Sequence, residues 1–198
     1  MRVIAGSFKG RRLNSPSWDG LRPTSDKLRE TLFNILAPRI VGARVLDGYA
    51  GTGALGIEAL SRGAAAVTFV ERDRRAQALI EENLARCGIA DGYVIIRATV
   101  ARALEAMRER SAPHPFDPFD VILFDPPYDS ARGDAGTPEG ADQVGAALAA
   151  AGDVMAGDGV LVLEHARKRR APDAAGRLVR TREVSAGDSA LAFYACQP

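Results

Sequence analysis

Apolar segments and helix-forming segments alternate along most of this chain, and the alternation is the strongest constraint on its fold. Short apolar runs occupy residues 44–47, 67–71, 93–96, 120–124 and 159–164. Between them, residues 54–62, 73–87, 99–110 and 139–151 have the composition and apolar spacing of helices. Strands that are apolar throughout are buried on both faces. The pattern therefore predicts a mostly parallel sheet covered by helices, a doubly wound α/β fold.

The two ends of the chain depart from this alternation. Residues 177–184 and 189–196 read as strands joined by the turn Ala186-Gly187-Asp188, which predicts an antiparallel hairpin at one edge of the sheet. Near the start, Thr24-Ser25-Asp26 offers helix-capping side chains, and we expect the helix that follows to end at Pro38. Residues 1–20 indicate a small β-hairpin arm ahead of one domain over residues 21–198.

Composition narrows the class of protein. With 198 residues, 46% of them hydrophobic, the chain can bury the core of one such domain. No apolar run approaches the roughly 18 residues of a membrane span, and the first residues lack signal-peptide features. Cys87 and Cys196 fit free thiols in a reducing compartment, and His114 and His165 belong to no ligand cluster. We therefore expect a cytoplasmic monomer without a metal.

Positive charge is concentrated in two segments, although the net charge of the chain is only +1. Residues 1–30 hold seven Lys or Arg against three Asp or Glu, and residues 167–182 hold seven against one Asp. Two such segments on an acidic remainder indicate a surface that meets phosphate. A solvated face explains either segment alone equally well, and the interpretation gains if the fold brings both to one side.

A glycine-rich turn follows the first strand of the sheet. Gly51-Thr52-Gly53-Ala54-Leu55-Gly56 satisfies G-x-G-x-x-G, and Glu71 stands 20 residues after Gly51, where it can bind ribose hydroxyls. Both a nicotinamide cofactor and S-adenosylmethionine fit this pattern. Asp47, at the end of the first strand, favours the second, because a carboxylate repels a pyrophosphate but attracts an ammonium and tolerates a sulfonium.

The tetrapeptide Asp125-Pro126-Pro127-Tyr128 follows the fourth strand directly. The carboxyl ends of parallel strands form the ligand-binding edge of such a sheet. An exocyclic base amine becomes a nucleophile when two acceptors hold its N–H groups, and the Asp125 carboxylate and the Pro126 carbonyl can supply them. Consecutive prolines stiffen the loop, and Tyr128 offers a flat face for an extruded base. These residues predict methyl transfer to a planar nitrogen.

Several stretches together resemble a known family. Residues 47–64 and the tetrapeptide 125–128 are similar to class I methyltransferases with a [D/N]PP[Y/F] motif. The opening Arg2-Val3-Ile4-Ala5-Gly6, then Gly10-Arg11-Arg12-Leu13, and residues 22–36 resemble one branch, the RsmD family of small-subunit rRNA guanine-N2 methyltransferases. The match is specific from residue 2 to about residue 128 and looser beyond.

The resemblance implies a seven-stranded, Rossmann-like sheet, S-adenosylmethionine as methyl donor, and one guanine of 16S rRNA in the small ribosomal subunit as substrate. It implies that residues 1–20 form a basic RNA-binding arm and residues 21–198 the catalytic domain. By position, the cofactor contacts would be Asp47, Ala50, Gly51, Gly53 and Glu71, with Thr99 where many members have Asp or Asn at the adenine. Residues that would meet RNA are Arg2, Lys9, Arg11, Arg12, Arg22 and Thr24.

Other functions fit part of the pattern. The tetrapeptide also suits methylation of adenine N6, cytosine N4 or a protein glutamine, since its chemistry does not identify the base. A dinucleotide-dependent oxidoreductase would use the glycine turn but is disfavoured by Asp47. A non-catalytic RNA-binding protein would explain the basic segments and leave the tetrapeptide without a role.

Overall fold

The computed structural model describes residues 1–16, 18, 25–109, 117–126 and 138–197. The helices are α1 (Asp26–Ile40), α2 (Ala54–Ser61), α3 (Arg74–Arg86), α4 (Val100–Glu109) and α5 (Pro138–Gly152). The strands are β1 (Arg44–Gly48), β2 (Ala66–Val70), β3 (Tyr93–Ile96), β4 (Phe119–Phe124), β5 (Met155–Ala166), β6 (Ala174–Ala175), β7 (Leu178–Ala186) and β8 (Ser189–Cys196). The strand–helix alternation expected from the sequence is confirmed.

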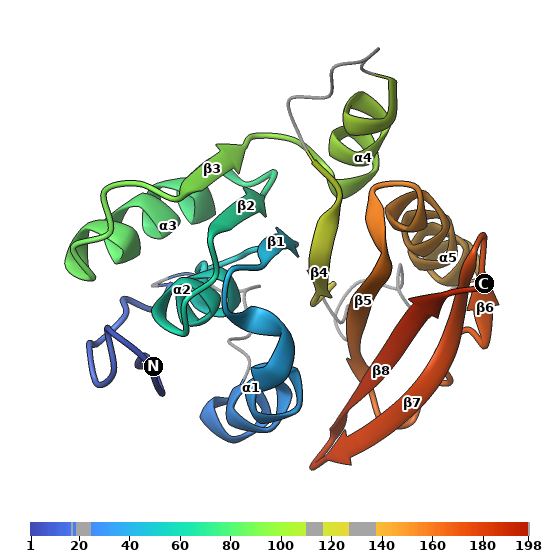
Figure 1. The fold of residues 1–198 in the computed structure, drawn as a ribbon, viewed down its shortest axis with the longest axis horizontal. Helices are drawn as coiled ribbons and strands as arrows, with labels where there is room; N and C mark the ends of the chain where they lie inside the picture. The colour runs from blue at the N-terminus through green and yellow to red at the C-terminus, as the bar shows by residue number, and fades with distance from the viewer. Residues whose placement is uncertain (17, 19–24, 110–116, 127–137, 198) are drawn as a thin grey trace.

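The strands form a single sheet in the order β3-β2-β1-β4-β5-β8-β7-β6 (Figure 1). β3, β2, β1, β4 and β5 pair in parallel, whereas β8 pairs antiparallel with β5 and with β7. The chain therefore moves outward from β1 in both directions, and β1 and β4 flank the point where the strand order reverses. That point is where open α/β sheets bind ligands.

Both faces of the sheet are buried, which explains why its strands lack polar alternation. In β4, Val121 and Leu123 join a core that includes side chains of α1, α2 and α3. Ile122 and Phe124 join a second core, on the opposite face, with side chains of α4 and α5. Successive side chains of a strand point to opposite faces, so each apolar strand serves two cores at once.

Three expectations about elements need correction. The sheet has eight strands among the described residues rather than seven, because the two-residue β6 adds an edge strand beside β7. β5 begins at Met155, before the apolar run that predicted it. Pro38 lies inside α1 rather than at its end. A proline in the last turn removes a single helical N–H donor, and Ile40 is drawn into the core, so the helix continues.

The first fourteen residues, which we call the N-terminal strap, pair with themselves and pack on the body of the molecule. Val3 donates its backbone N–H to Arg11, Gly10 donates to Val3, and Arg2 and Arg12 form an antiparallel bridge. Val3 and Leu13 are buried in the core beside α1 and α2. The expected hairpin is present, but its inner face is part of the folded domain.

None of the helices in the described part of the chain combines the length and the apolar composition that a membrane span needs.

Candidate functional site

Three acidic side chains meet where β1, β2 and β4 end side by side. Gly48, the last residue of β1, pairs with Val70 of β2 and with Phe124 of β4. Asp47 precedes Gly48, while Glu71 and Asp125 are the residues that directly follow the other two strands. The parallel register therefore gathers the carboxylates singled out by the sequence at one edge of the sheet, which we call the carboxyl edge.

Asp47 is the most perturbed of these groups. Its side chain is 1% exposed, and its Oδ2 accepts a hydrogen bond from the backbone N–H of Gly56 at 2.8 Å. Its Oδ1 is buried and has no hydrogen-bond partner among the described residues. The pKa of Asp47 is raised to about 8, chiefly by burial and in smaller part by the nearby carboxylates of Asp125 and Glu71, whereas the Gly56 hydrogen bond lowers it.

The unpartnered Asp47 oxygen is the feature that a ligand would complete. A buried acceptor without a partner costs about 1–3 kcal/mol, so an ammonium donor placed against it restores the missing interaction. Because Gly56 is in the first turn of α2, the bound oxygen also caps that helix from the strand. The Asp47 acceptor therefore fits the ammonium at the methionine end of S-adenosylmethionine and does not fit a pyrophosphate.

The glycine turn adopts a backbone that only some residues tolerate. Gly51 and Gly53 have φ values of +54° and +75°, and Tyr49 has the same left-handed sign at +69°. For a bulky side chain this conformation is strained, and the Tyr49 ring lies edge-on to Phe124 with centroids 5.5 Å apart. Gly48 has no room for a side chain, because a Cβ there would lie 2.6 Å from the Phe124 ring.

Glu71 ties the end of β2 to the glycine turn. One of its oxygens accepts from the Gly51 N–H at 2.9 Å, and the other accepts from the Asp73 N–H at 2.8 Å. Each carboxylate oxygen can accept a second hydrogen bond, so the half-buried side chain keeps capacity for ribose hydroxyls. Ala50 is anchored to the same strand, since it donates its N–H to Val70.

Thr99 has a local structural role that the sequence left open. Its Oγ1 accepts from the Arg102 N–H at 3.3 Å and its carbonyl accepts from Ala103, which makes Thr99 the N-cap of α4. The side chain is exposed, and the hydroxyl proton remains available as a donor. Contact between Thr99 and an adenine stays a prediction.

Residues behind the turn hold it in place, and sequence reasoning did not assign them to the site. Asn83 of α3 donates to the Thr52 carbonyl at 3.0 Å and accepts from the Asn14 N–H at 2.6 Å. Gln77 donates to the Glu71 carbonyl at 2.7 Å. Both amides are buried on the inward face of α3. A polar residue among apolar helical positions was the available signal.

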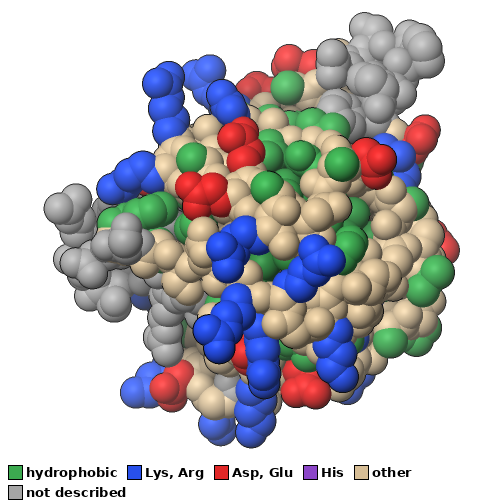
Figure 2. Space-filling model, turned by 90° about the vertical axis from the view of Figure 1, so that its left-hand side faces the viewer, with side chains coloured by type: hydrophobic (Ala, Val, Ile, Leu, Met, Phe, Trp, Pro, Cys, Tyr) green, Lys and Arg blue, Asp and Glu red, His purple; other side chains and the backbone are tan. Residues whose placement is uncertain are grey.

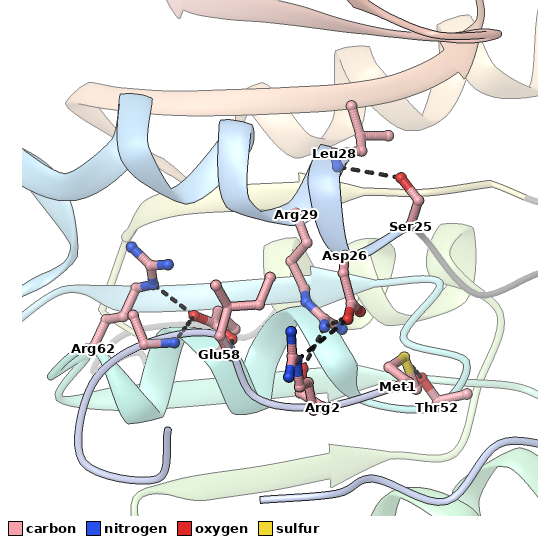
Figure 3. A network of polar contacts seen from close by, with 11 residues as sticks. Met1, Arg2, Ser25, Asp26, Leu28, Arg29, Thr52, Glu58 and Arg62 are labelled. Carbon is pink, nitrogen blue, oxygen red and sulfur yellow. Dashed lines mark hydrogen bonds and ion pairs between the residues drawn. The ribbon is translucent and has the colours of Figure 1, made fainter. Parts of the chain in front are cut away.

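The N-terminal strap is fastened to α1 and α2 by buried charged groups (Figure 3). Glu58 is 1% exposed and accepts from the N–H groups of Ile4 and Ala5 and from Arg62 Nε. Arg29 of α1 is fully buried and donates to the Arg2 carbonyl and to the Asp26 carboxylate, 2.9 Å away. Met1, at the end of the strap, lies with its sulfur 3.9 Å from Thr52 Oγ1.

Only part of the predicted tetrapeptide and RNA set can be placed. Asp125 and Pro126 are described and half-buried at the end of β4. Pro127 and Tyr128 lie outside the described residues, as do Arg22 and Thr24. Ser25 does cap α1 as expected, since its Oγ accepts from the Leu28 N–H at 3.2 Å.

The two basic segments lie at opposite ends of the parallel strands: the N-terminal one near their amino ends, and the other at the carboxyl edge. Arg11 donates to the Arg86 carbonyl at the last residue of α3, and the neighbouring turn packs on Ser61 at the last residue of α2. Both helices begin at the carboxyl edge, so Lys9, Arg11 and Arg12 lie at their far ends. Figure 2 looks onto the side of the molecule that carries the N-terminal strap and α3, at the left of Figure 1, and shows many Lys and Arg side chains there. Arg167 to Arg170 instead follow the carboxyl end of β5.

Comparison with known proteins places the chain in a family. The family model described as "Conserved hypothetical protein 95" matches residues 1–195. A Bacillus subtilis protein named "Putative rRNA methyltransferase YlbH" is 37% identical over 196 residues, 98% of each chain. "Ribosomal RNA small subunit methyltransferase D" of Escherichia coli is 42% identical over 128 residues, which are 65% of this chain and 60% of that protein.

Solved structures agree with this placement. A structure described as "Putative methyltransferase yhhF from Escherichia coli" superposes with a TM-score of 0.76 and 29% identity, covering 100% of this chain and 98% of that one. The methyltransferase interpretation of the glycine turn is thereby favoured over the oxidoreductase alternative. From the family model and the full-length relative, the chain belongs to the RsmD-type family of methyltransferases.

Proposed function

We propose that this protein transfers the methyl group of S-adenosylmethionine to the exocyclic N2 amine of one guanine of 16S rRNA in the small ribosomal subunit. One observation carries the proposal. Asp47 Oδ1, buried and without a hydrogen-bond partner among the described residues, lies at the end of β1 beside the strand that presents Asp125. An ammonium-binding carboxylate and an amine-binding carboxylate therefore share one edge, as methyl transfer between these two partners requires.

The cofactor side of the site is built from β1, β2 and α2. Asp47 receives the ammonium, Glu71 receives ribose hydroxyls, and the turn from Ala50 to Gly53 brings the backbone close to the ligand. When bound, S-adenosylmethionine supplies an electrophilic methyl group on a sulfonium. Thr99 stands at the start of α4, where the adenine amine would meet it.

The substrate side is built from the residues that follow β4. The Asp125 carboxylate accepts one N–H of the target amine, and the Pro126 carbonyl accepts the other. Two acceptors turn the amine's lone pair toward the methyl group, and the fixed proline backbone keeps that geometry without reorganisation. Tyr128 stacks on the base, which must leave its own stack to reach the site.

The choice of the small subunit rests on the name of a relative, and the choice of guanine N2 rests on the resemblance of residues 2–13 and 22–36 to the RsmD family. The Escherichia coli relative is named as a methyltransferase of small-subunit ribosomal RNA. This chain spans 60% of that protein's length in the match. Methylation of adenine N6, cytosine N4 or a protein glutamine is the alternative within the same chemistry.

The test is methylation of small subunits that lack the modification. Subunits from a strain deleted for the enzyme are incubated with the purified protein and labelled S-adenosylmethionine, and the modified nucleoside is mapped by mass spectrometry. We expect one N2-methylguanosine in 16S rRNA. Asp125→Ala should lower turnover by about 100-fold or more, since orientation and charge stabilisation are removed together, while cofactor binding stays within a few-fold.

Two results would refute the proposal. The first is a different modified base, or methyl transfer to protein. The second is calorimetry in which NAD binds more tightly than S-adenosylmethionine, because the Asp47 site should repel a pyrophosphate. Retained turnover in Asp125→Ala would remove the role given to that carboxylate.

A further inference from the structure

A basic loop follows β5 at the same edge of the sheet as Asp47 and Asp125. Residues 167–173, Arg-Lys-Arg-Arg-Ala-Pro-Asp, connect β5 to β6, and we call them the β5–β6 loop. We propose that the β5–β6 loop binds the phosphate backbone of the RNA next to the target nucleotide. The inference rests on the proposed function, because it takes the substrate to be a polyanion.

The ends of β1, β2, β4 and β5 at the carboxyl edge carry acidic side chains. These four adjacent strands each place one acidic residue near that edge. Glu71 and Asp125 directly follow β2 and β4, whereas Asp47 and Glu164 lie within β1 and β5. Asp47 is protonated below its pKa of about 8, so the repulsion of a phosphate comes from the other carboxylates, and it is weakly screened at short range. An RNA that inserts a base here must have its flanking phosphates held by cations at the rim.

Strand register places the loop at that rim. Phe124 of β4 pairs with Leu163 of β5, so Glu164 is level with Asp125. Arg167 follows three residues later, roughly 10 Å farther along the strand direction. In Figure 1, β4 and β5 run side by side in the same direction, and the turn between β7 and β8 lies beyond their ends. The Arg167 N–H donates to Asp188 in that turn at 2.8 Å.

The loop backbone is held by contacts that do not use its charged side chains. The Arg169 N–H donates to the Ala166 carbonyl, Ala171 is 3% exposed, and the Pro172 carbonyl accepts from the buried Tyr194 hydroxyl at 2.8 Å. The cations are therefore presented on a fixed support. A pre-ordered loop loses less conformational entropy when it binds than a mobile tail does.

Internal ion pairs account for only part of the loop's charge. Arg170 pairs with Asp173 at 2.7 Å. Arg167 and Lys168 are exposed and have no carboxylate partner within the part of the chain that the structure describes. These two side chains are the ones that a phosphate would engage, and their removal should leave the backbone support intact.

The experiment measures binding of unmethylated small ribosomal subunits by filter retention over a range of salt concentrations around the physiological value. The variant Arg167→Ser with Lys168→Ser is compared with the matched control Arg39→Ser with Arg108→Ser. The control removes the same charge at the opposite edge, where Arg39 meets the Asp158 carbonyl and Arg108 lies 3.9 Å from Asp153. S-adenosylmethionine affinity is measured on every protein to check that the site is intact.

We expect the loop variant to bind about tenfold more weakly at about 100 mM salt, with the slope of log K against log salt reduced by about 1.4, or about 0.7 for each phosphate that is no longer neutralised. The control should stay within about twofold of the wild type, because Arg39 and Arg108 belong neither to the β5–β6 loop nor to the N-terminal strap and contact Asp158 and Asp153 instead.

The outcomes distinguish failure of the phosphate contact from failure of the proposed function. An unchanged slope in the loop variant, while the wild type methylates the subunits, would overturn this inference and leave the proposed function standing. If the wild type methylates another nucleic acid and the slope still falls, the phosphate contact is supported and the rRNA assignment fails. A protein substrate with no salt effect would overturn both.

Discussion

At the residue scale, Asp47 joins folding to ligand binding through its two oxygens. One oxygen caps α2 at Gly56, and the other is buried without a partner among the described residues. The sequence predicted that Asp47 contacts the cofactor, because a carboxylate at the end of the first strand favours S-adenosylmethionine over a nicotinamide cofactor. It did not predict the cap, because the helix N-terminus that meets Asp47 is fixed by how the glycine turn folds back.

The raised pKa makes the stability of the ligand-free protein depend on pH. The folded pKa of Asp47 is about 8, whereas an unfolded aspartate has a pKa near 3.9. Between these values the folded state keeps a proton that the unfolded state releases, so the free energy of unfolding falls as pH rises, and the fall ends above pH 8. Asp47→Asn, which mimics the protonated acid, should remove this slope.

We expect Asp47→Asn to gain about 2–4 kcal/mol relative to the wild type between about pH 5 and pH 8, measured by urea unfolding at each pH. The same variant should bind S-adenosylmethionine about tenfold more weakly or worse, because the ammonium loses an ionised partner. Parallel stability curves for the two proteins would show that Asp47 is ionised in the ligand-free fold.

At the element scale, the sequence was most informative where a segment is buried on both sides. β1, β2, β3 and β4 were predicted to within a residue or two because apolar runs have no other stable place in such a sheet. The C-terminal end of α1 and the start of β5 were missed. Pro38 and residues 155–158 read as breaks in the sequence, and only tertiary packing continues the helix and the strand through them. The docking of the N-terminal strap was missed for a related reason, because its partners are distant in sequence.

Glu58 holds the strap to α2, and the prediction for it follows from burial. Glu58→Gln replaces an oxygen that accepts from Ile4 or Ala5 with a donor, leaving a buried N–H unpaired. We expect a loss of about 2–4 kcal/mol in the free energy of unfolding. Faster hydrogen exchange at the amides of Ile4 and Ala5 should accompany it.

Glu81→Gln is the matched control, because Glu81 pairs with Arg97 at 3.1 Å on the surface and its side chain is 53% exposed. An exposed pair contributes at most about 1 kcal/mol. Equal stability of the Glu58 and Glu81 variants would mean that the strap is held by its apolar contacts, Val3 and Leu13, and not by Glu58.

At the scale of the whole molecule, the charge pattern predicted from sequence divides between two places. The N-terminal cations and the β5–β6 loop lie at opposite ends of the parallel strands, so the fold does not bring the two basic segments to one side, and the phosphate interpretation does not gain from their union. The eight residues of α2 alone extend about 12 Å between those ends. The sequence alone could not place the two segments, because a hairpin can dock at either end of the helices it covers.

Replacing Arg11 and Arg12 with Ala should weaken binding of small ribosomal subunits and lower its salt slope by about 0.7 for each phosphate that these cations neutralise. Filter binding checks this. Because the two basic places are far apart, the effects of this variant and of the β5–β6 loop variant on log K should add. An unchanged slope would mean that the N-terminal strap does not touch phosphate, and a strongly non-additive result would mean that both variants disturb a single interaction.

The strap also has a consequence for the order in which the chain can fold during synthesis. Ile4 and Ala5 bond to Glu58, Asn14 bonds to Asn83, and Arg11 bonds to the carbonyl of Arg86. Each partner is translated 53 to 75 residues after the group it binds. The N-terminal strap must therefore wait for these partners until α2 and α3 have emerged from the ribosome. It is one of the later parts of the domain to reach its native place, although it is made before the helices that hold it.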